Sequence, residues 1–257
     1  MKAVILAGGR GTRIEEESQY KPKPMVEIGG KPIIWHIMKI YSHYNIKNFI
    51  ICCGYKGYLI KEYFVNYFLH NSDIEVKIKE NQVKLFNREE EDWNIILADT
   101  GLDTATAGRL KKVEQYLLED ENFCFTYGDG LADIKIDEKI NFHLNHKKNL
   151  TLSAVQLPGR YGSLEIHNNE VKKFLEKPKG DNLTINGGFF VLRKEIFKYI
   201  RSYNESWEED TLPRIVMDNQ AMAYTHNGFF GSMDSLRDKN QLNNLWNSNL
   251  AKWKMWK

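Results

Sequence analysis

The N-terminal sequence MKAVILAGGRGTR, residues 1–13, is an apolar run that stops abruptly in a cluster of glycines. Residues 3–7 are all apolar without polar alternation, which is typical of a strand buried on both faces of a sheet. The run is far shorter than the ~20 residues of a membrane helix and too short for a signal peptide. It therefore predicts the first strand of the fold, leading into a glycine-rich loop.

The loop itself has the composition of a phosphate-binding segment. Gly8, Gly9 and Gly11 let backbone amides approach phosphate oxygens, and Thr12 and Arg13 add a hydroxyl and a bidentate cation. No Gly-Lys-Ser/Thr ends it, so it is not a P-loop, and it lacks the third glycine of a dinucleotide fingerprint. A tight turn with no ligand is the alternative interpretation.

Strand-like and helix-like segments alternate through the first half of the chain. Buried strands are predicted at residues 48–53, 93–98 and 122–127, and amphipathic helices at residues 32–44, 56–70 and 106–118. This alternation predicts parallel strands joined by right-handed helical crossovers, with ligands at the carboxyl ends of the strands.

Beyond residue 141 the alternation of strands and helices gives way to short strand-like runs, at residues 150–157, 163–167, 171–175 and 188–192. Helices are expected at residues 207–218 and 235–250. With no linker or repeat between the halves, we predict one α/β domain over residues 1–257. Its fold class is a Rossmann-like mixed, mostly parallel sheet flanked by helices, with a more antiparallel C-terminal half. The two functional halves are about 1–140 and 141–257.

Composition excludes several classes of protein. With 36 Lys and Arg against 34 Asp and Glu, the net charge of +2 is too balanced for general binding to nucleic acid or a membrane surface. Cys52, Cys53 and Cys124 lie in apolar runs and cannot form a disulfide framework, which favours a reducing cytosol.

A further segment adds charge near the loop. In KPKPM, residues 21–25, the prolines are expected to hold Lys21 and Lys23 extended with both side chains on the same side, although a solvated basic loop is the alternative.

Two carboxylates are candidates to bind a metal. Asp129 lies just past a buried strand, and Asp234 is a second carboxylate that suits Mg²⁺. Asp234 has a competing role as the N-cap of the helix beginning near Ser235.

Together AGGRGTR, KPKPM, TYGDG, EKP, INGG and a late Asp resemble the nucleotidyltransferases that make nucleotide sugars from a sugar 1-phosphate and a nucleoside triphosphate. The longer segments WHIMKIYSHYNIKNFIICCGYKGYLIKEYF, FTYGDGLAD, EKPKGDNLTINGGFFVL and SMDSLRDKNQL are similar to the glucose-1-phosphate cytidylyltransferase branch. The resemblance covers nearly the whole chain.

The resemblance implies a role for each matching residue. The catalytic residues would be Arg13, Lys23 and Asp129, with Lys23, not Lys21, on the reacting phosphate. The nucleotide would lie against the N-terminal half, at Leu6, Ala7, Gly8, Gly9, Gly11, Thr12, Arg13, Lys23, Thr104, Arg109 and Gly128. The sugar phosphate would be held by Glu176, Lys177, Asn186 and Gly187, and Mg²⁺ by Asp129 and Asp234. Arg10 stands where the family has an apolar residue, and we expect it to face solvent.

The reaction so implied is attack of glucose 1-phosphate on the α-phosphorus of CTP, giving CDP-glucose and pyrophosphate. The acceptor phosphate is already anionic at neutral pH, so no protein base is required. The alternatives are dTTP or UTP, a different phosphate acceptor, or a catalytically silent nucleotide-binding module. The family also implies a homo-oligomer, a hexamer, with no nucleic-acid or membrane partner.

Overall fold

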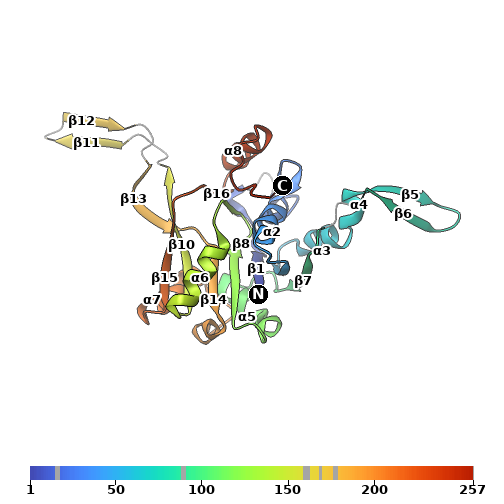
Figure 1. Cartoon of the computed structure of the whole chain (residues 1–257), viewed down its shortest axis with the longest axis horizontal. Helices are drawn as coiled ribbons and strands as arrows, with labels where there is room; N and C mark the ends of the chain where they lie inside the picture. The colour runs from blue at the N-terminus through green and yellow to red at the C-terminus, as the bar shows by residue number, and fades with distance from the viewer. Residues whose placement is uncertain (15–17, 88–90, 159–162, 168–169, 176–178, 257) are drawn as a thin grey trace.

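The computed structural model describes residues 1–14, 18–87, 91–158, 163–167, 170–175 and 179–256. At its centre is an eight-stranded mixed sheet with the order β13-β10-β14-β8-β1-β4-β7, in which β15 also pairs with β10 (Figure 1). Its strands are β1 (Lys2–Ala7), β4 (Asn48–Cys53), β7 (Asn94–Asp99), β8 (Asn122–Tyr127), β10 (Leu150–Pro158), β13 (Lys179–Asn186), β14 (Phe190–Arg193) and β15 (Ala221–His226).

The N-terminal part of the sheet is parallel, as the alternation of strands and helices predicts. β1 runs parallel to both β4 and β8, and β4 runs parallel to β7. Every residue of β1 after Lys2 is buried, because helices cover both faces of the sheet. The carboxyl ends of β1 and β8 therefore lie side by side and deliver the loops that follow them to one edge.

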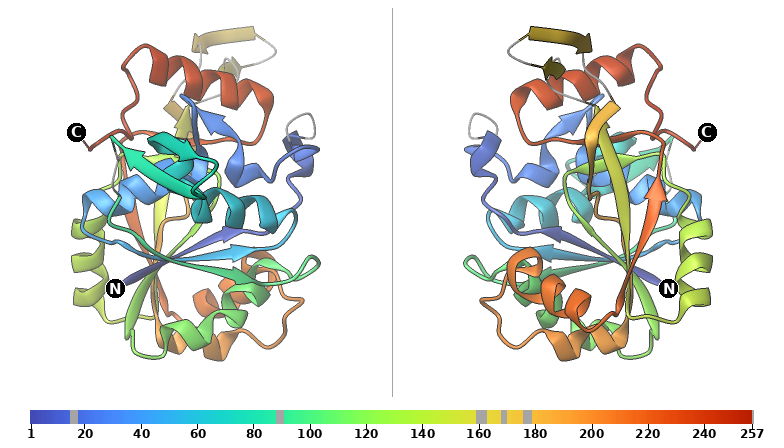
Figure 2. Two further views of the ribbon diagram at one scale, coloured as in Figure 1. Left: turned by 90° about the vertical axis from the view of Figure 1, so that its right-hand side faces the viewer. Right: turned by 90° about the vertical axis from the view of Figure 1, so that its left-hand side faces the viewer.

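Helices lie on both sides of the twisted sheet (Figure 2). The α-helices are α2 (Ile33–His43), α3 (Gly57–Val65), α4 (Tyr67–Asn71), α5 (Thr106–Lys112), α6 (Ile136–His146), α7 (Leu212–Met217) and α8 (Leu236–Asn247). Shorter turns are the 3-10 segments η1 (Thr12–Ile14), η2 (Lys23–Met25), η3 (Glu114–Leu117) and η4 (Lys194–Tyr199), and the π-helical η5 (Trp207–Thr211).

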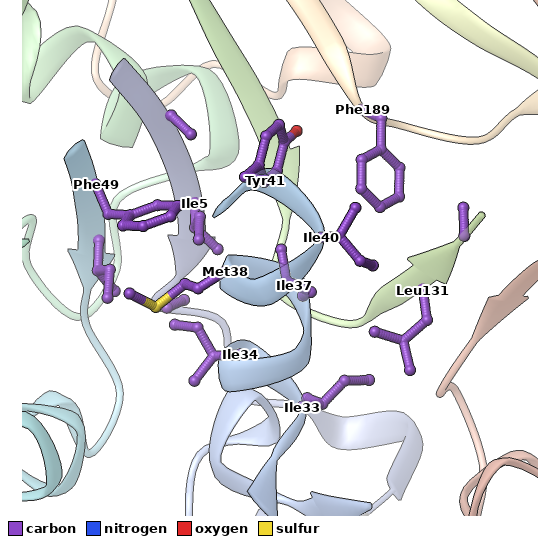
Figure 3. Packing of buried hydrophobic residues seen from close by; sticks show 14 of the residues in the cluster. Ile5, Ile33, Ile34, Ile37, Met38, Ile40, Tyr41, Phe49, Leu131 and Phe189 are labelled. Carbon is purple, nitrogen blue, oxygen red and sulfur yellow. The ribbon is translucent and has the colours of Figure 1, made fainter. Parts of the chain in front are cut away.

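Alternate residues of β1 face two separate hydrophobic clusters. Ala3, Ile5 and Ala7 belong to the cluster that includes α2, whereas Val4 and Leu6 face the cluster that includes α5. α2 is almost entirely buried, and Figure 3 shows its isoleucines between the sheet and Leu131. Its N-cap is Pro32, whose missing N–H costs nothing at a helix start.

The C-terminal half is more antiparallel, as expected, with one exception. β14 pairs antiparallel with both β8 and β10, and β13 pairs antiparallel with β10, but β15 runs parallel to β10. The strand expected at residues 188–192 begins only at Phe190, because the chain turns through a left-handed backbone at Gly188 and Phe189.

Three predicted helices are wrong in extent. Residues 56–70 form α3 and α4, separated at Asn66, and residues 106–118 form α5 followed by the 3-10 segment η3. Residues 207–218 begin as the π-helix η5 before α7. In each case helical structure is present where it was predicted, but it does not continue as one α-helix.

Two hairpins project from the body of the molecule, on opposite sides (Figure 1). They are β5 (Asp73–Lys77) with β6 (Gln82–Phe86), and β11 (Ser163–His167) with β12 (Glu170–Leu175). Two smaller pairs lie near the site: β2 (Glu27–Ile28) with β3 (Lys31–Pro32), and β9 (Gly130–Ala132) with β16 (Phe230–Ser232). Within the described ranges, no helix combines the length and the apolarity needed to cross a bilayer.

Candidate active site

A pocket of about 320 Å³ lies at the carboxyl ends of β1 and β8. It is lined by Leu6, Ala7, Gly8, Gly9, Gly11, Thr12, Lys23, Pro24, Thr104, Ala105, Thr106, Arg109, Tyr127, Gly128 and Asp129. All the residues predicted to bind the nucleotide thus line one pocket, apart from Arg13, whose side chain lies outside the described part of the structure. Loops distant in sequence meet here because the parallel strands end at one edge of the sheet.

Close approach of other groups explains why glycines occupy this loop. A Cβ added to Gly8 would lie 2.2 Å from Nη1 of Arg109, and one on Gly128 would lie 2.5 Å from the carbonyl oxygen of Leu6. Gly11 has a φ of +66°, a left-handed conformation that costs other residues energy. The glycines therefore allow the loop to pack tightly against β8 and Arg109 at the floor of the pocket.

Arg109 lines the pocket, but its guanidinium bonds neighbouring protein groups. Nη1 donates to Thr100 Oγ1 and to the carbonyl of Gly101, each at 2.7 Å, and Nη2 donates to the carbonyl of Leu102 at 3.1 Å. Arg109 therefore fixes the loop after β7, which carries Thr104 into the pocket. This use of the arginine is a structural role that the sequence did not reveal.

Lys23 lies between two carboxylates at the mouth of the pocket. Its Nζ donates to Asp129 Oδ2 at 2.6 Å and to Asp234 Oδ1 at 2.9 Å. Burial alone would lower the pKa of Lys23, but the two carboxylates outweigh burial and raise it, so the side chain is a cation. Three of the predicted catalytic and metal-binding residues therefore meet in one cluster.

The expected conformation of KPKPM is wrong. Lys23 begins the 3-10 turn η2, in which the amide of Met25 donates to the carbonyl of Pro22, so the two lysines do not share one extended face. Lys23 turns inward, whereas Lys21 pairs with the exposed Glu27 at 2.8 Å. The structure thus gives the two lysines different partners, in agreement with the family resemblance, which assigns the reacting phosphate to Lys23 and not to Lys21.

The position of Asp234 is set by a short β-pairing. β16 pairs with β9, and the amide of Met233 donates to the carbonyl of Asp129 at 2.9 Å. The alternative role for Asp234 as a helix cap is wrong, because Ser235 is the N-cap of α8 and forms a capping box with Asp238. The carboxylate of Asp234 faces Lys23 instead.

The residues expected to hold the sugar phosphate are only partly described. Glu176 and Lys177 lie outside the described residues. Asn186 ends β13, and its Nδ2 donates to the hydroxyl of Tyr127 at 3.3 Å, next to the pocket. Gly187 packs against Val155, where a Cβ would lie 2.6 Å from Cγ1. Asn186, and with it Gly187, therefore lies beside the pocket, next to Tyr127.

Arg10 is exposed and pairs with Asp103 at 3.0 Å, as expected for a residue facing solvent.

A larger groove, of about 800 Å³, lies near the amino ends of β10 and β15 and includes Asn149 and Gln220. It is far from the strand carboxyl ends, so we assign the chemistry to the smaller pocket.

Asp129 and Asp234 are the described residues best suited to hold a divalent cation. No group of three His, Cys, Asp or Glu side chains in the described parts of the chain is arranged to ligate a metal. A hard cation such as Mg²⁺ commonly takes only one or two carboxylates and completes its coordination with substrate phosphates and water. The ammonium of Lys23 already contacts both carboxylates, so a small cation fits the charge of this pair.

A family model described as nucleotidyl transferase matches residues 2–245. This chain belongs to the nucleotidyl transferase family. It is 54% identical, over 256 residues covering all of both chains, to proteins named glucose-1-phosphate cytidylyltransferase from Salmonella typhimurium and Salmonella typhi. The fold resembles that of HddC from Yersinia pseudotuberculosis, solved in complex with GMP-PN, with a TM-score of 0.69 and 24% identity over 95% of this chain and 99% of that one.

Within this family site, sequence reasoning missed four lining residues: Pro24, Ala105, Thr106 and Tyr127. Tyr127 immediately precedes Gly128 and Asp129, so its position at the end of a buried strand was the available signal. Pro24 was considered only for its effect on the backbone. Thr106 begins α5 and Ala105 is its N-cap, so the predicted start of that helix at Thr106 was the available signal.

Proposed function

We propose that this protein transfers the cytidylyl group of CTP to α-D-glucose 1-phosphate, forming CDP-glucose and pyrophosphate. The observation that carries the proposal is the convergence of Lys23, Asp129 and Asp234 at the mouth of a glycine-lined pocket. The choice of CTP and glucose 1-phosphate rests on the full-length similarity to the Salmonella proteins of that name.

The nucleotide lies in the pocket with its phosphates against the glycine-rich loop. The backbone amides of this loop and the hydroxyl of Thr12 supply donors, and Arg13 stabilises the departing pyrophosphate. Thr104 and Gly128 line the nucleoside side of the pocket, and Arg109 keeps the loop of Thr104 in place.

Transfer begins with the phosphate oxygen of glucose 1-phosphate, which attacks the α-phosphorus of CTP in line. A new oxygen–phosphorus bond forms as the bond to pyrophosphate breaks, and the electron pair leaves with pyrophosphate. The acceptor oxygen is anionic near neutral pH, so the protein supplies position and charge rather than a base. The Lys23 ammonium offsets the negative charge on the reacting phosphate.

Asp129 and Asp234 are the residues that would hold Mg²⁺, which would supply charge neutralisation at the phosphates. The two carboxylates are supported at their positions by the β9–β16 pairing and by the backbone bond from Met233 to Asp129. Lys23, whose ammonium contacts both carboxylates, lies where it would offset negative charge on the reacting phosphate.

The acceptor is held on the C-terminal side. Asn186 and Gly187 face its sugar and phosphate, together with Glu176 and Lys177, for which the family resemblance is the only support. Residues 1–257 act as one domain, with the nucleotide in the half at about 1–140 and the acceptor in the half at about 141–257. Strand β14 supports this organisation, because it pairs with β8 from the first half.

The protein assembles as a homo-oligomer, and the family resemblance favours a hexamer. The β5–β6 hairpin supports self-association. Its register pairs Ile74 with Leu85 and Val76 with Val83, which places four apolar side chains on one face of an isolated two-stranded ribbon. Such a ribbon is at best marginally stable in water, so covering this face with another copy would stabilise it.

The deciding experiment is pyrophosphate release from CTP, UTP, dTTP and ATP, each with glucose 1-phosphate and Mg²⁺. We expect rapid release with CTP alone and a loss of two or more orders of magnitude in the Asp129→Asn variant. Release with another nucleotide would overturn the choice of base. No release with any nucleotide would first direct attention to other sugar phosphates and then to a catalytically silent module.

A further inference from the structure

We propose that Lys139 is a positioning residue for residues 186–189, the acceptor loop, and that it sets the affinity for the sugar phosphate rather than for the nucleotide. The inference rests on the proposed function for its substrate. It concerns a lysine on α6 that is not among the residues assigned above to either ligand.

Lys139 is completely buried, and its Nζ is bonded to neutral oxygens. It donates to Ser153 Oγ at 2.6 Å and to the carbonyl oxygen of Phe189. Among the residues that the structure describes, no carboxylate forms an ion pair with it. Burial of a lysine without a carboxylate is costly, and an apolar side chain would fill the same space more cheaply. The hydrogen bonds that Lys139 makes are therefore what offsets the cost of burying it.

Those bonds hold an unfavourable stretch of backbone. Gly188 has a φ of +70° and Phe189 a φ of +45°, so two consecutive residues are left-handed. For a bulky residue such as Phe189 this conformation is strained and persists only where its surroundings fix it. The Phe189 side chain lies against Tyr41 in the core (Figure 3), with ring centroids 5.8 Å apart. Lys139 holds the carbonyl of Phe189 by a hydrogen bond.

Ser153 extends this hold to the rest of the acceptor loop. Its amide donates to the carbonyl of Gly188 at 3.2 Å, and its carbonyl accepts from the amide of Gly187 at 2.8 Å. The amide of Gly188 in turn donates to Asn186 Oδ1 at 2.9 Å, which leaves Asn186 Nδ2 directed at Tyr127 beside the pocket. A chain of bonds thus runs from Lys139 to the amide group of Asn186.

The chemistry of a buried amine fits this role. Burial lowers the pKa of Lys139 well below its usual range and so favours the neutral form. A neutral amine has two N–H donors, and they match the two acceptors, Ser153 Oγ and the Phe189 carbonyl. Removing the amine leaves the buried carbonyl of Phe189 with only the long bond from Ser153 Oγ, at 3.5 Å, and the strained turn then relaxes.

The test compares Lys139→Met and Ser153→Ala with Thr151→Val as the matched control. Thr151 lies on β10 two residues before Ser153, is also buried, and bonds His143 and His146 instead of Lys139. Steady-state kinetics with CTP and glucose 1-phosphate are measured together with hydrogen exchange at the amides of residues 187–189.

For Lys139→Met we expect the KM for glucose 1-phosphate to rise about tenfold, the effect of one lost buried hydrogen bond, while the KM for CTP stays within about twofold. Ser153→Ala should shift the same KM in the same direction, and both variants should accelerate exchange in the acceptor loop. Thr151→Val should leave the kinetics and the exchange unchanged. This split would not arise from a general loss of stability.

A rise of both KM values together, or unchanged exchange at residues 187–189 in both variants, would overturn the proposal. The exchange measurement needs no substrate. If the wild-type protein fails to use glucose 1-phosphate, the proposed function fails, and exchange still decides whether Lys139 positions the acceptor loop. If Lys139→Met does not fold, Ser153→Ala provides both readouts.

Discussion

The contact of Lys23 with both Asp129 and Asp234 gives the two lysines of KPKPM opposite expected behaviour. Lys23→Met should lower kcat roughly 10²–10³-fold, because no cation then offsets charge on the reacting phosphate. In EDTA the same variant should unfold at lower temperature, since two adjacent carboxylates lose their counter-charge. Lys21→Met is the matched control, because Lys21 pairs with the exposed Glu27, and its kcat should stay within about twofold. Equal losses in the two variants would contradict the assignment.

Residue by residue, the sequence predicted the site where its side chains lie at strand ends. Gly8, Gly11 and Asp129 were found because each comes directly after a buried strand or in its loop, and such ends meet at one edge of a parallel sheet. The use of Arg109 could not be predicted in this way. Its partners at residues 100–102 lie on another loop, and only the folded chain brings its guanidinium against Gly8.

At the scale of elements, α2 and the C-terminal segment share a buried histidine. His36 bonds the carbonyl of Ile28 through Nε2 at 2.8 Å, and the indole of Trp253 donates to its Nδ1 at 3.4 Å. Trp253 is fully buried, so the C-terminal segment packs against this domain. Trp253 is thus linked through His36 to Ile28 in the β2–β3 segment, which follows Lys23 in the chain.

This histidine makes folding stability depend on pH. Burial lowers the pKa of His36 from 6.5 to about 4. Between these two pH values His36 is therefore protonated in the unfolded chain but neutral in the folded chain. Stability should be greatest above pH 6.5 and fall as pH drops to 4, by up to about 3 kcal/mol from this group. Urea unfolding of wild type and His36→Gln measures it. In His36→Gln the free energy of unfolding should depend less steeply on pH. Some dependence should remain, because burial also lowers the pKa of His143 to about 4.

The division of residues 56–70 into α3 and α4 shows where periodicity stops being informative. The apolar spacing continues through Asn66, yet the helix ends there, and Tyr67 then accepts a hydrogen bond from Trp35 Nε1 at 3.0 Å. A contact with α2, distant in the sequence, decides the break. Local patterns predict that a helix exists here but cannot predict its end.

For the whole molecule, the alternation of strands and helices predicted the parallel core but not how the second half joins it. β14 enters between β8 and β10 and turns the sheet antiparallel at that point. Nothing in the residues of β14 specifies this neighbour, because any apolar four-residue strand satisfies the same pattern. The β5–β6 hairpin was not predicted either, and its strands are almost wholly exposed, outside the sheet whose pattern the prediction followed.

That hairpin provides a test of assembly. Val76 and Val83 are a cross-strand pair on its apolar face, 49% and 57% exposed, whereas Glu75 and Lys84 are a pair on the opposite face. Replacing both valines with lysine puts two like charges where a second copy is expected to pack, so the molar mass in light scattering after gel filtration should fall. Exchanging the charges, with Glu75→Lys and Lys84→Glu, keeps the apolar face and should leave the mass unchanged. A wild-type protein that runs as a 30.1 kDa monomer, or a double-lysine variant with the wild-type mass, would show that this face is not the contact between copies.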